Sequence, residues 1–172
     1  GEGYRLEVVR DQLDGEFMQL VAEFLQREGA LKNPDQAQLR ATQTVAVAYD
    51  GQGNLAAVHS AERRYLPQLL NEFWAISVFV GKQHRRFHLA RHLNLVGKEY
   101  LLRQYAAGND PMVVGLYMRM QSPRLKPADQ RAVAYYSGYY FVGRNARGDN
   151  LRIFYFPGVK IDAGSLDISG AD

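Results

Sequence analysis

The sequence predicts one α/β domain with a mixed sheet, and three observations support this prediction. Short runs rich in β-branched and aromatic residues alternate with segments whose apolar residues recur at helical spacing. The run Phe73–Val80 is almost entirely apolar, which is typical of a central strand covered on both faces. The 172 residues can form one core, and no repeat or linker interrupts them. We therefore expect one domain over residues 1–172, with a loose tail from about Asp162.

The amino-terminal half is expected to contain a strand, a helix and a hairpin. The strand covers Tyr4–Arg10, which is rich in β-forming residues. A helix follows, because apolar residues fall on one stripe and Gly29 offers a stop. That stripe consists of Leu13, Phe17, Leu20, Val21, Phe24 and Leu25. A turn or short helix at Asn33–Leu39 then leads to the hairpin, in which Thr44–Asp50 pairs with a strand starting at Leu55.

The carboxy-terminal half continues with two helices and three strands. Helical spacing and a stop before Gly108 indicate the first helix. Its apolar positions are Leu89, Leu93, Val96 and Tyr100. A strand over Met112–Met120 comes next, and proline near a first turn favours a helix over Pro127–Tyr136. The last hairpin is expected to pair Tyr139–Gly143 with Leu151–Phe156.

Composition excludes several classes of protein. The chain has no cysteine, which excludes disulfides, a thiolate nucleophile and cysteine-type zinc sites. No apolar run approaches the roughly 20 residues that span a bilayer, and the first residues lack the apolar core of a secretion signal. We therefore expect a cytoplasmic protein. The net charge of +3 is too small an excess to indicate nucleic acid as a partner.

Basic residues gather where the central strand gives way to the next helix. The cluster contains Lys82, His84, Arg85, Arg86, His88, Arg91 and His92. A helix amino terminus offers unpaired N–H groups and a partial positive charge, so a diphosphate is a suitable ligand for this junction. A solvated basic helix face is the alternative. The histidines recur every four residues, but the neighbouring arginines would repel a cation and we expect no metal.

Two short patterns accompany this order of elements. After the strand segment Ser77–Val80, the loop Arg85–Ala90 aligns with the pattern Arg/Gln-x-x-Gly-x-Gly/Ala, with His88 at the first glycine. Further on, Ala132 and Tyr135 keep an Ala-x-x-Tyr spacing before Gly-Tyr. With these patterns, from Tyr4 to about Phe156, the chain resembles the GNAT superfamily of N-acetyltransferases. The resemblance implies a mixed, mostly antiparallel twisted sheet with helices on both faces.

The resemblance also implies acyl-CoA as the co-substrate. In that family two neighbouring strands splay apart, and the strand before the loop offers its backbone to the pantetheine arm. The residues that would supply this backbone are Val78, Phe79 and Val80. The residues that would surround the diphosphate are Arg85, Arg86, Phe87, His88, Leu89 and Ala90. A histidine at position 88 can crowd this site or point into solvent, because glycine normally lets the phosphate approach the backbone.

The chemistry implied is direct attack of an amine on the thioester, which needs no cysteine. By resemblance, Tyr135 or Tyr136 would protonate the thiolate leaving group, and Glu72 would accept the proton of the ammonium. His59 and Glu62 are weaker candidates for the base. Each residue also has a structural interpretation: the tyrosines pack in the core, Glu72 is an exposed carboxylate, and His59 is half-buried.

The sequence is therefore consistent with three functions. The first is an acyl-CoA-dependent N-acyltransferase that moves an acetyl or longer acyl group to an amine. The second is a GNAT-like binding or regulatory module without catalysis, suggested by His88 and by the short spacing of Tyr135 to Gly138, three residues where the family usually has four. The third is a nucleic-acid binder using the basic helix face. The acceptor amine and the acyl length are not readable from the sequence, and a homodimer stays open.

Overall fold

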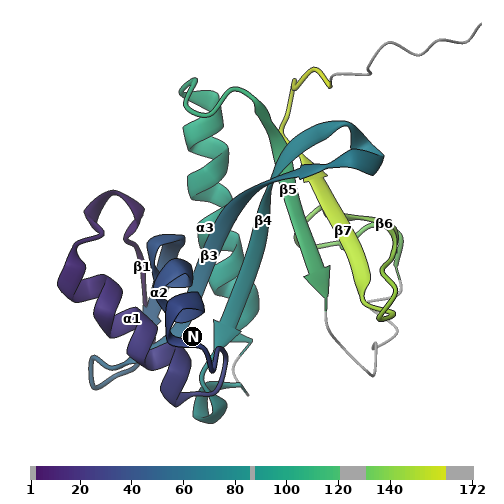
Figure 1. Cartoon of the computed structure of the whole chain (residues 1–172). Helices are drawn as coiled ribbons and strands as arrows, with labels where there is room; N and C mark the ends of the chain where they lie inside the picture. Colours follow the sequence, from purple (N-terminus) through teal and green to yellow (C-terminus); the bar gives the residue numbers. More distant parts are fainter. Residues whose placement is uncertain (1–2, 86–87, 121–130, 162–172) are drawn as a thin grey trace, which may run out of the picture. The chain divides into compact units, whose positions relative to one another are not determined.

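The computed structural model describes residues 3–85, 88–120 and 131–161. Within these ranges the chain forms seven strands, three α-helices and three short 3-10 helices (Figure 1). Their bounds are β1 Arg5–Val8, η1 Arg10–Gln12, α1 Gly15–Arg27, α2 Pro34–Thr42, β2 Thr44–Tyr49, β3 Leu55–Leu66, η2 Pro67–Leu69, β4 Asn71–Val80, η3 Lys82–His84, α3 Leu89–Ala106, β5 Val113–Met120, β6 Tyr140–Arg144 and β7 Asn150–Tyr155. None of these helices is long and apolar enough to cross a membrane.

The strands form a sheet in the order β1-β2-β3-β4-β5-β7-β6. The pairs β1–β2, β2–β3, β5–β7 and β6–β7 are antiparallel, so the predicted mixed α/β fold with a mostly antiparallel sheet is confirmed. The chain divides into two compact units, residues 1–62 with 76–107 and residues 63–75 with 108–172. Strands β3 and β4 contribute to both units, which are described separately below. A single domain over residues 1–172 stays a prediction.

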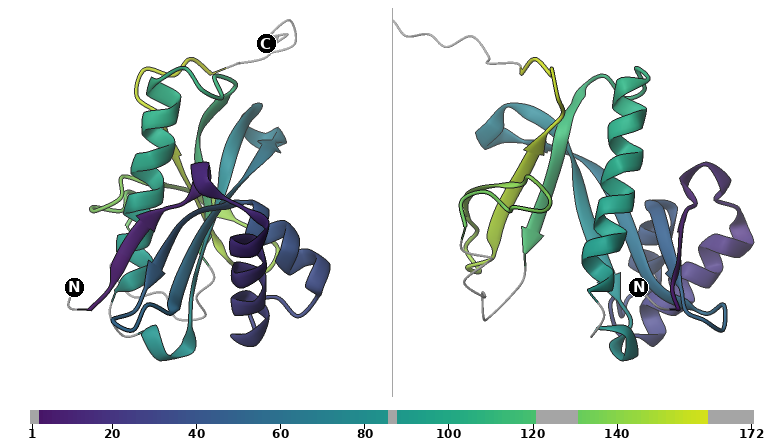
Figure 2. Two further views of the ribbon diagram at one scale, coloured as in Figure 1. Left: turned by 90° about the vertical axis from the view of Figure 1, so that its left-hand side faces the viewer. Right: turned by 180° about the vertical axis from the view of Figure 1, so that it is seen from behind.

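In the first unit, helices cover both faces of the sheet (Figure 2). The alternation along β2 shows why, because successive side chains of a strand point to opposite faces. Val47 packs among the residues of α1 and α2, whereas Ala46 and Ala48 pack with Leu89 and Leu93 of α3. The prediction of helices on both faces is therefore confirmed for this unit.

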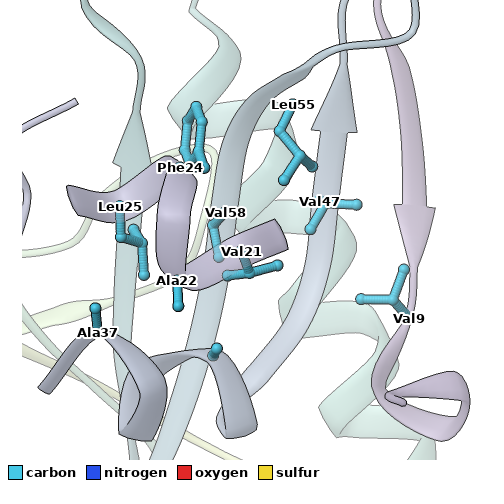
Figure 3. Packing of buried hydrophobic residues seen from close by; sticks show 10 residues of the cluster. Val9, Val21, Ala22, Phe24, Leu25, Ala37, Val47, Leu55 and Val58 are labelled. Carbon is cyan, nitrogen blue, oxygen red and sulfur yellow. The ribbon is translucent and has the colours of Figure 1, made fainter. Parts of the chain in front are cut away.

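The apolar core on the side of α1 and α2 follows from helix starts encoded locally. The Asp14 carboxylate accepts a hydrogen bond from the Phe17 N–H at 2.7 Å and caps α1. Asn33 caps α2 in the same way, through the Gln36 N–H at 3.1 Å. The buried residues of this core are Val9, Val21, Ala22, Phe24, Leu25, Ala37, Ala41, Val47, Leu55 and Val58 (Figure 3). The predicted stripe is confirmed for Val21, Phe24 and Leu25, which are buried, whereas Leu20 is exposed.

On the other face, small side chains let α3 approach the sheet closely. Ala46, Ala48 and Ala57 lie beneath the helix. Farther along, Gly97 lies against the buried ring of His59, and a Cβ at position 97 would be 2.5 Å from the Nε2 and Cε1 atoms of that ring. Real Cβ atoms do not come so close to other heavy atoms, so glycine is required there by packing.

The second unit has its own core, in which Phe73 of β4 packs with Val114 of β5 and Ile153 of β7. The predicted last hairpin is confirmed as β6 and β7. The predicted helix over Pro127–Tyr136 is wrong for residues 131–136, which form a bridge and a turn. Its first residues, 127–130, and the tail from Asp162 lie outside the described residues.

Replacing Gly97 by alanine is expected to lower the free energy of unfolding. The methyl group would overlap the His59 ring, and overpacking of this kind costs roughly 1–3 kcal/mol. The gain in helix propensity recovers about 1 kcal/mol at most. Urea denaturation of Gly97→Ala measures the net loss.

The control is the same substitution in a His59→Ala background, where the space for the methyl group exists. There the cost of Gly97→Ala should vanish, and the double-mutant cycle gives the coupling between the two positions. A gain in stability of Gly97→Ala in the native background, as at an open helical position, would contradict the contact.

Candidate functional site

The segment that joins β4 to α3, residues 81–88, is called the β4–α3 loop here. Its start is fixed by hydrogen bonds from elements far apart in the sequence. The Gly81 N–H donates to the Ala56 carbonyl of β3 at 2.9 Å. The next N–H, of Lys82, donates to the Glu28 carboxylate at 3.0 Å, directly after α1 ends. Residues 86 and 87 of the loop lie outside the described residues.

His84 ties the same loop to the start of the chain. The hydroxyl group of Tyr4 lies 2.9 Å from His84 Nδ1, and the two rings meet edge to face with centroids 5.6 Å apart. The His84 N–H also donates to the Gly81 carbonyl at 2.9 Å, which closes a tight turn. The first half of the loop is therefore held by α1, β3 and the segment before β1.

Arg85 leaves this turn with a defined direction. Its Nε donates to the Val80 carbonyl at 3.3 Å, and its guanidinium lies over the Phe79 ring, 5.9 Å from the centroid. Phe79 in turn packs edge to face against Phe24 of α1. The side chain of Arg85 is exposed, so the positive charge stays in solvent while its stem is anchored at the end of β4.

His88 has the backbone conformation that glycine normally provides. Its φ is 52° and its ψ is 18°, in the left-handed region that side chains rarely adopt. The imidazole is exposed and makes no hydrogen bond to the amides of α3. The first N–H groups of a helix have no acceptor within it, so the amides of Leu89 and Ala90 are not bound by carbonyl groups of α3 itself. The side chain of His88 is thus exposed, and its effect on a bound phosphate stays a prediction.

The final residues of β4 divide between the two faces of the sheet. Val78 and Val80 pack on the side of α3, and Phe79 packs on the side of α1. The structure thus brings Val78–Val80, Arg85, His88, Leu89 and Ala90 together in the first unit, at the end of β4 and the start of α3. Arg86 and Phe87 cannot be placed with them, since they lie outside the described residues.

Glu72 lies in the second unit and is engaged by an arginine. Its carboxylate accepts hydrogen bonds from two nitrogens of Arg63, of which Nε is 3.2 Å away. The same guanidinium lies 3.8 Å from Asp110, and the hydrogen bond to Glu72 raises the pKa of Arg63. The carboxylate of Glu72 is thus already occupied by hydrogen bonds to a guanidinium. The catalytic role of Glu72 stays a prediction.

Tyr135 and Tyr136 lie at an exposed turn of the second unit. Their exposed fractions are 79% and 66%, and the rings meet edge to face with centroids 5.0 Å apart. The turn is closed by Gly138, whose φ is 70° and whose N–H donates to the Ala134 carbonyl at 2.8 Å. The Ser-Gly pair in the sequence is a turn signal that could have predicted it. Protonation of the thiolate by either tyrosine stays a prediction.

The weaker candidates for the base have different surroundings. His59 is fully buried beneath α3, and burial lowers the pKa of its imidazole from 6.5 to about 4. Its ring nitrogens have no hydrogen-bond partner within the described part of the chain. Glu62 is half-buried on β3. Two further residues, Tyr4 and Glu28, shape the loop without any pattern in the sequence that marks them.

Comparisons with known proteins agree on the fold. Neither a protein-family model nor a curated protein sequence matches the chain. A ribosomal-protein-S5-alanine acetyltransferase from Vibrio fischeri matches in structure with a TM-score of 0.60 at 12% identity, over 93% of this chain and 97% of that one. A GNAT-family acetyltransferase from Streptococcus pneumoniae gives 0.56 at 13% identity, over 89% and 99%.

A third structure, a GNAT-family acetyltransferase from Brucella melitensis in complex with acetyl-CoA, gives a TM-score of 0.53 at 12% identity. The match covers 93% of this chain and 92% of that one. The chain therefore has the fold of GNAT acetyltransferases, and the predicted resemblance in fold is confirmed. At such low identity the likeness concerns the fold and assigns no residue a role.

The conformation of His88 predicts how substitutions change stability. His88→Gly should raise the free energy of unfolding by about 0.5–1 kcal/mol, because glycine adopts the left-handed region without strain. His88→Val should lower the free energy of unfolding by about 1 kcal/mol or more, since β-branched residues are disfavoured in the left-handed region. Chemical denaturation measures both.

The matched control is His92→Gly, at an exposed position inside α3. There glycine should destabilise the protein by about 1 kcal/mol, as at ordinary helix positions. Equal effects of glycine at positions 88 and 92 would contradict the special conformation of His88.

Burial of His59 predicts a dependence of stability on pH. In the folded protein the pKa of this imidazole is about 4, whereas the unfolded chain has the ordinary value of 6.5. Between pH 4 and pH 6.5 the unfolded chain binds a proton at His59 that the folded protein does not bind. The contribution of the buried neutral imidazole to the free energy of unfolding is therefore fully present above pH 6.5, and it is lost as the pH falls towards 4. The shift corresponds to roughly 3 kcal/mol at most.

Denaturation of the native protein and of His59→Gln between pH 4 and 8 measures this dependence. The variant keeps every other titrating group, so the difference in slope isolates His59. Parallel curves for the two proteins over that range would show that His59 titrates normally.

Proposed function

We propose that the protein is an acyl-CoA-dependent N-acyltransferase. The observation that carries the proposal is the start of α3. There His88 has a left-handed backbone directly before the first turn of the helix, whose N–H groups have no acceptor within α3, and Arg85 is anchored at the end of β4. Backbone amides, a helix dipole and a guanidinium together form a suitable site for a diphosphate. The diphosphate of CoA is the ligand with which this arrangement is most consistent.

The fold supports the same proposal. Solved structures with this fold include acetyltransferases, and one of them holds acetyl-CoA. Acyl-CoA carries its diphosphate at a distance from the reacting thioester, so the β4–α3 loop would act in binding and orientation only. In this proposal the backbone of Val78–Val80 would bind the pantetheine arm, and the protein would act in the cytoplasm, where acyl-CoA is made.

The reaction would be a direct transfer. The amine nitrogen attacks the thioester carbonyl carbon, the new C–N bond forms, and the C–S bond breaks to release a thiolate. The nitrogen loses one proton and the sulfur gains one. We assign the first proton to Glu72 and the second to Tyr135 or Tyr136, and holding both substrates in place would supply much of the rate enhancement.

A binding or regulatory module without catalysis is the second candidate, and two observations favour it. The carboxylate of Glu72 is engaged by Arg63, and Tyr135 and Tyr136 lie at an exposed turn. In this alternative the β4–α3 loop would bind CoA, and no acyl transfer would follow.

Calorimetric titration with acetyl-CoA and with longer acyl-CoAs tests the proposed site. Binding should weaken about tenfold or more in Arg85→Ala, which loses one charge-assisted hydrogen bond to a phosphate. The matched control is Arg103→Ala on α3, whose guanidinium pairs with Glu99 at 3.2 Å. That variant should bind as the native protein does.

Absence of binding for every acyl-CoA would contradict both candidates. If CoA binds, release of free thiol in the presence of a panel of primary amines separates the two. Turnover with any amine supports the transferase, whereas binding without turnover across the panel supports the module.

A further inference from the structure

The second unit carries an exposed hairpin whose apolar surface extends well beyond the one tyrosine that proton donation in acyl transfer would need. Residues 131–144, called the aromatic hairpin here, fold back on themselves at Tyr135–Gly138. The Ala134 N–H donates to the Tyr139 carbonyl at 2.9 Å, and the Phe141 N–H donates to the Ala132 carbonyl at 2.8 Å. A short outer strand around Val133 is thereby added to the edge of β6.

The surface of this hairpin is unusually apolar for an exposed edge. Six large apolar side chains are exposed within ten consecutive residues. They are Val133, Tyr135, Tyr136, Tyr140, Phe141 and Val142. Tyr135 and Tyr136 meet edge to face at the tip, and both side chains remain largely exposed. Large apolar side chains that are exposed together in one short segment indicate an interaction site more strongly than single exposed ones do.

The hairpin is also held rigidly from below. Arg152 of β7 is 2% exposed, and its guanidinium donates to the Arg131 carbonyl at 2.8 Å and to the Tyr139 carbonyl at 3.5 Å. Tyr139 is itself buried and packs against Phe154, with ring centroids 6.0 Å apart. Both arms of the hairpin are therefore fixed to β7, and a partner would bind without first ordering the surface.

Positive charge increases from the tip of the aromatic hairpin towards its open end, called its base here. Arg131 and Arg144 lie at the open end of the hairpin, Arg147 lies in the next turn, and all three are exposed. Between residues 131 and 161 the sequence has one acidic residue, Asp149. Its carboxylate already accepts a hydrogen bond from Asn145 at 2.9 Å and lies 3.6 Å from Arg119. The base of the hairpin thus presents guanidinium groups to an anionic partner.

From these features we propose that the aromatic hairpin is a docking surface for an extended, acidic segment of another polypeptide. Tyrosine, phenylalanine and arginine are the residues enriched in protein interfaces, and the exposed valines match apolar side chains of a peptide. Those valines would contribute nothing to stacking on nucleic-acid bases. The length from the tip to Arg144 corresponds to about six to eight extended residues.

The edge of the hairpin suits an extended partner. In the antiparallel bridge of Val133 with Tyr140, the two flanking residues make the hydrogen bonds to β6, so the N–H and C=O of Val133 point outwards. A strand laid along this edge can pair with them. A second copy of this chain is a poorer partner, because both copies would bring the same guanidinium groups into one interface.

The test is a search for binding peptides on the full chain. A phage library of random peptides, each of about a dozen residues, is panned on the native protein and counter-selected on Tyr135→Ser/Tyr136→Ser. We expect enriched sequences that combine apolar residues with several Asp or Glu. Synthetic versions, followed by fluorescence anisotropy, should bind at least about tenfold more weakly to the tyrosine variant and to Arg144→Gln/Arg147→Gln.

The matched control is Arg64→Gln/Tyr65→Ser, which removes an exposed arginine and an exposed tyrosine from β3 of the same unit. It should bind the peptides as the native chain does. Circular dichroism confirms that each variant is folded. No enrichment over the bare support, enriched peptides without acidic residues, or equal binding to the tyrosine variant would each overturn the proposal.

Three further probes separate other partners. A labelled single-stranded oligouridylate, phosphatidylserine vesicles and sedimentation velocity of the protein alone test nucleic acid, membrane and self-association. Binding or association that depends on Tyr135 and Tyr136 in any of these, without peptide binding, would overturn the polypeptide assignment. All readouts are made without acyl-CoA, so the outcome is independent of the proposed transferase activity.

Discussion

The contact between Gly97 and His59 determines where α3 lies on the sheet of the first unit. A helix backbone can rest on an imidazole ring only where no Cβ intervenes, and the alanines of β2 and β3 extend this close approach towards the start of the helix. Once α3 is fixed, its first turn and the end of β4 are fixed too, and the β4–α3 loop must span the distance between them. The left-handed backbone of His88 is the conformation that closes this span. The proposed diphosphate site thus depends on packing more than two helical turns away from it.

The same contact explains the state of His59. A ring enclosed by α3 and the sheet cannot be hydrated, so its neutral form is favoured and its pKa is low. A group that is fully buried also has no path by which to receive a proton from an amine in solution. The surroundings of His59 fit a packing role, in which the ring fills the space between α3 and the sheet. Glu72 and the two tyrosines lie in the other unit, so the surroundings of His59 do not affect the roles proposed for them.

Periodicity predicted most of the fold because burial dictates it locally. The stripe of α1, the alternation of β2 and the apolar run of β4 each repeat with the period of their element. The prediction was wrong at residues 131–136, where a proline near the expected first turn had favoured a helix over Pro127–Tyr136. There the Ser-Gly turn and the buried Arg152, which is reached only through the tertiary fold, favour a hairpin instead. Tyr4 and Glu28 could not be predicted, since each contacts a loop residue more than fifty positions away.

The role of Glu28 shows how this loop differs from a glycine-rich one. A glycine-rich loop offers its own successive amides to phosphate. Here the Lys82 amide already donates a hydrogen bond to the Glu28 carboxylate, so it is not available to a ligand. The same carboxylate adds negative charge close to the site proposed for a diphosphate. Among the described residues of the loop and helix, the donors left for a phosphate include the amides at the start of α3 and the Arg85 guanidinium, whose direction is fixed by Val80 and Phe79. Binding of a diphosphate would therefore rest on the helix terminus and on one arginine more than on the loop backbone, and the charges of Lys82 and Arg85 would have to offset that of Glu28.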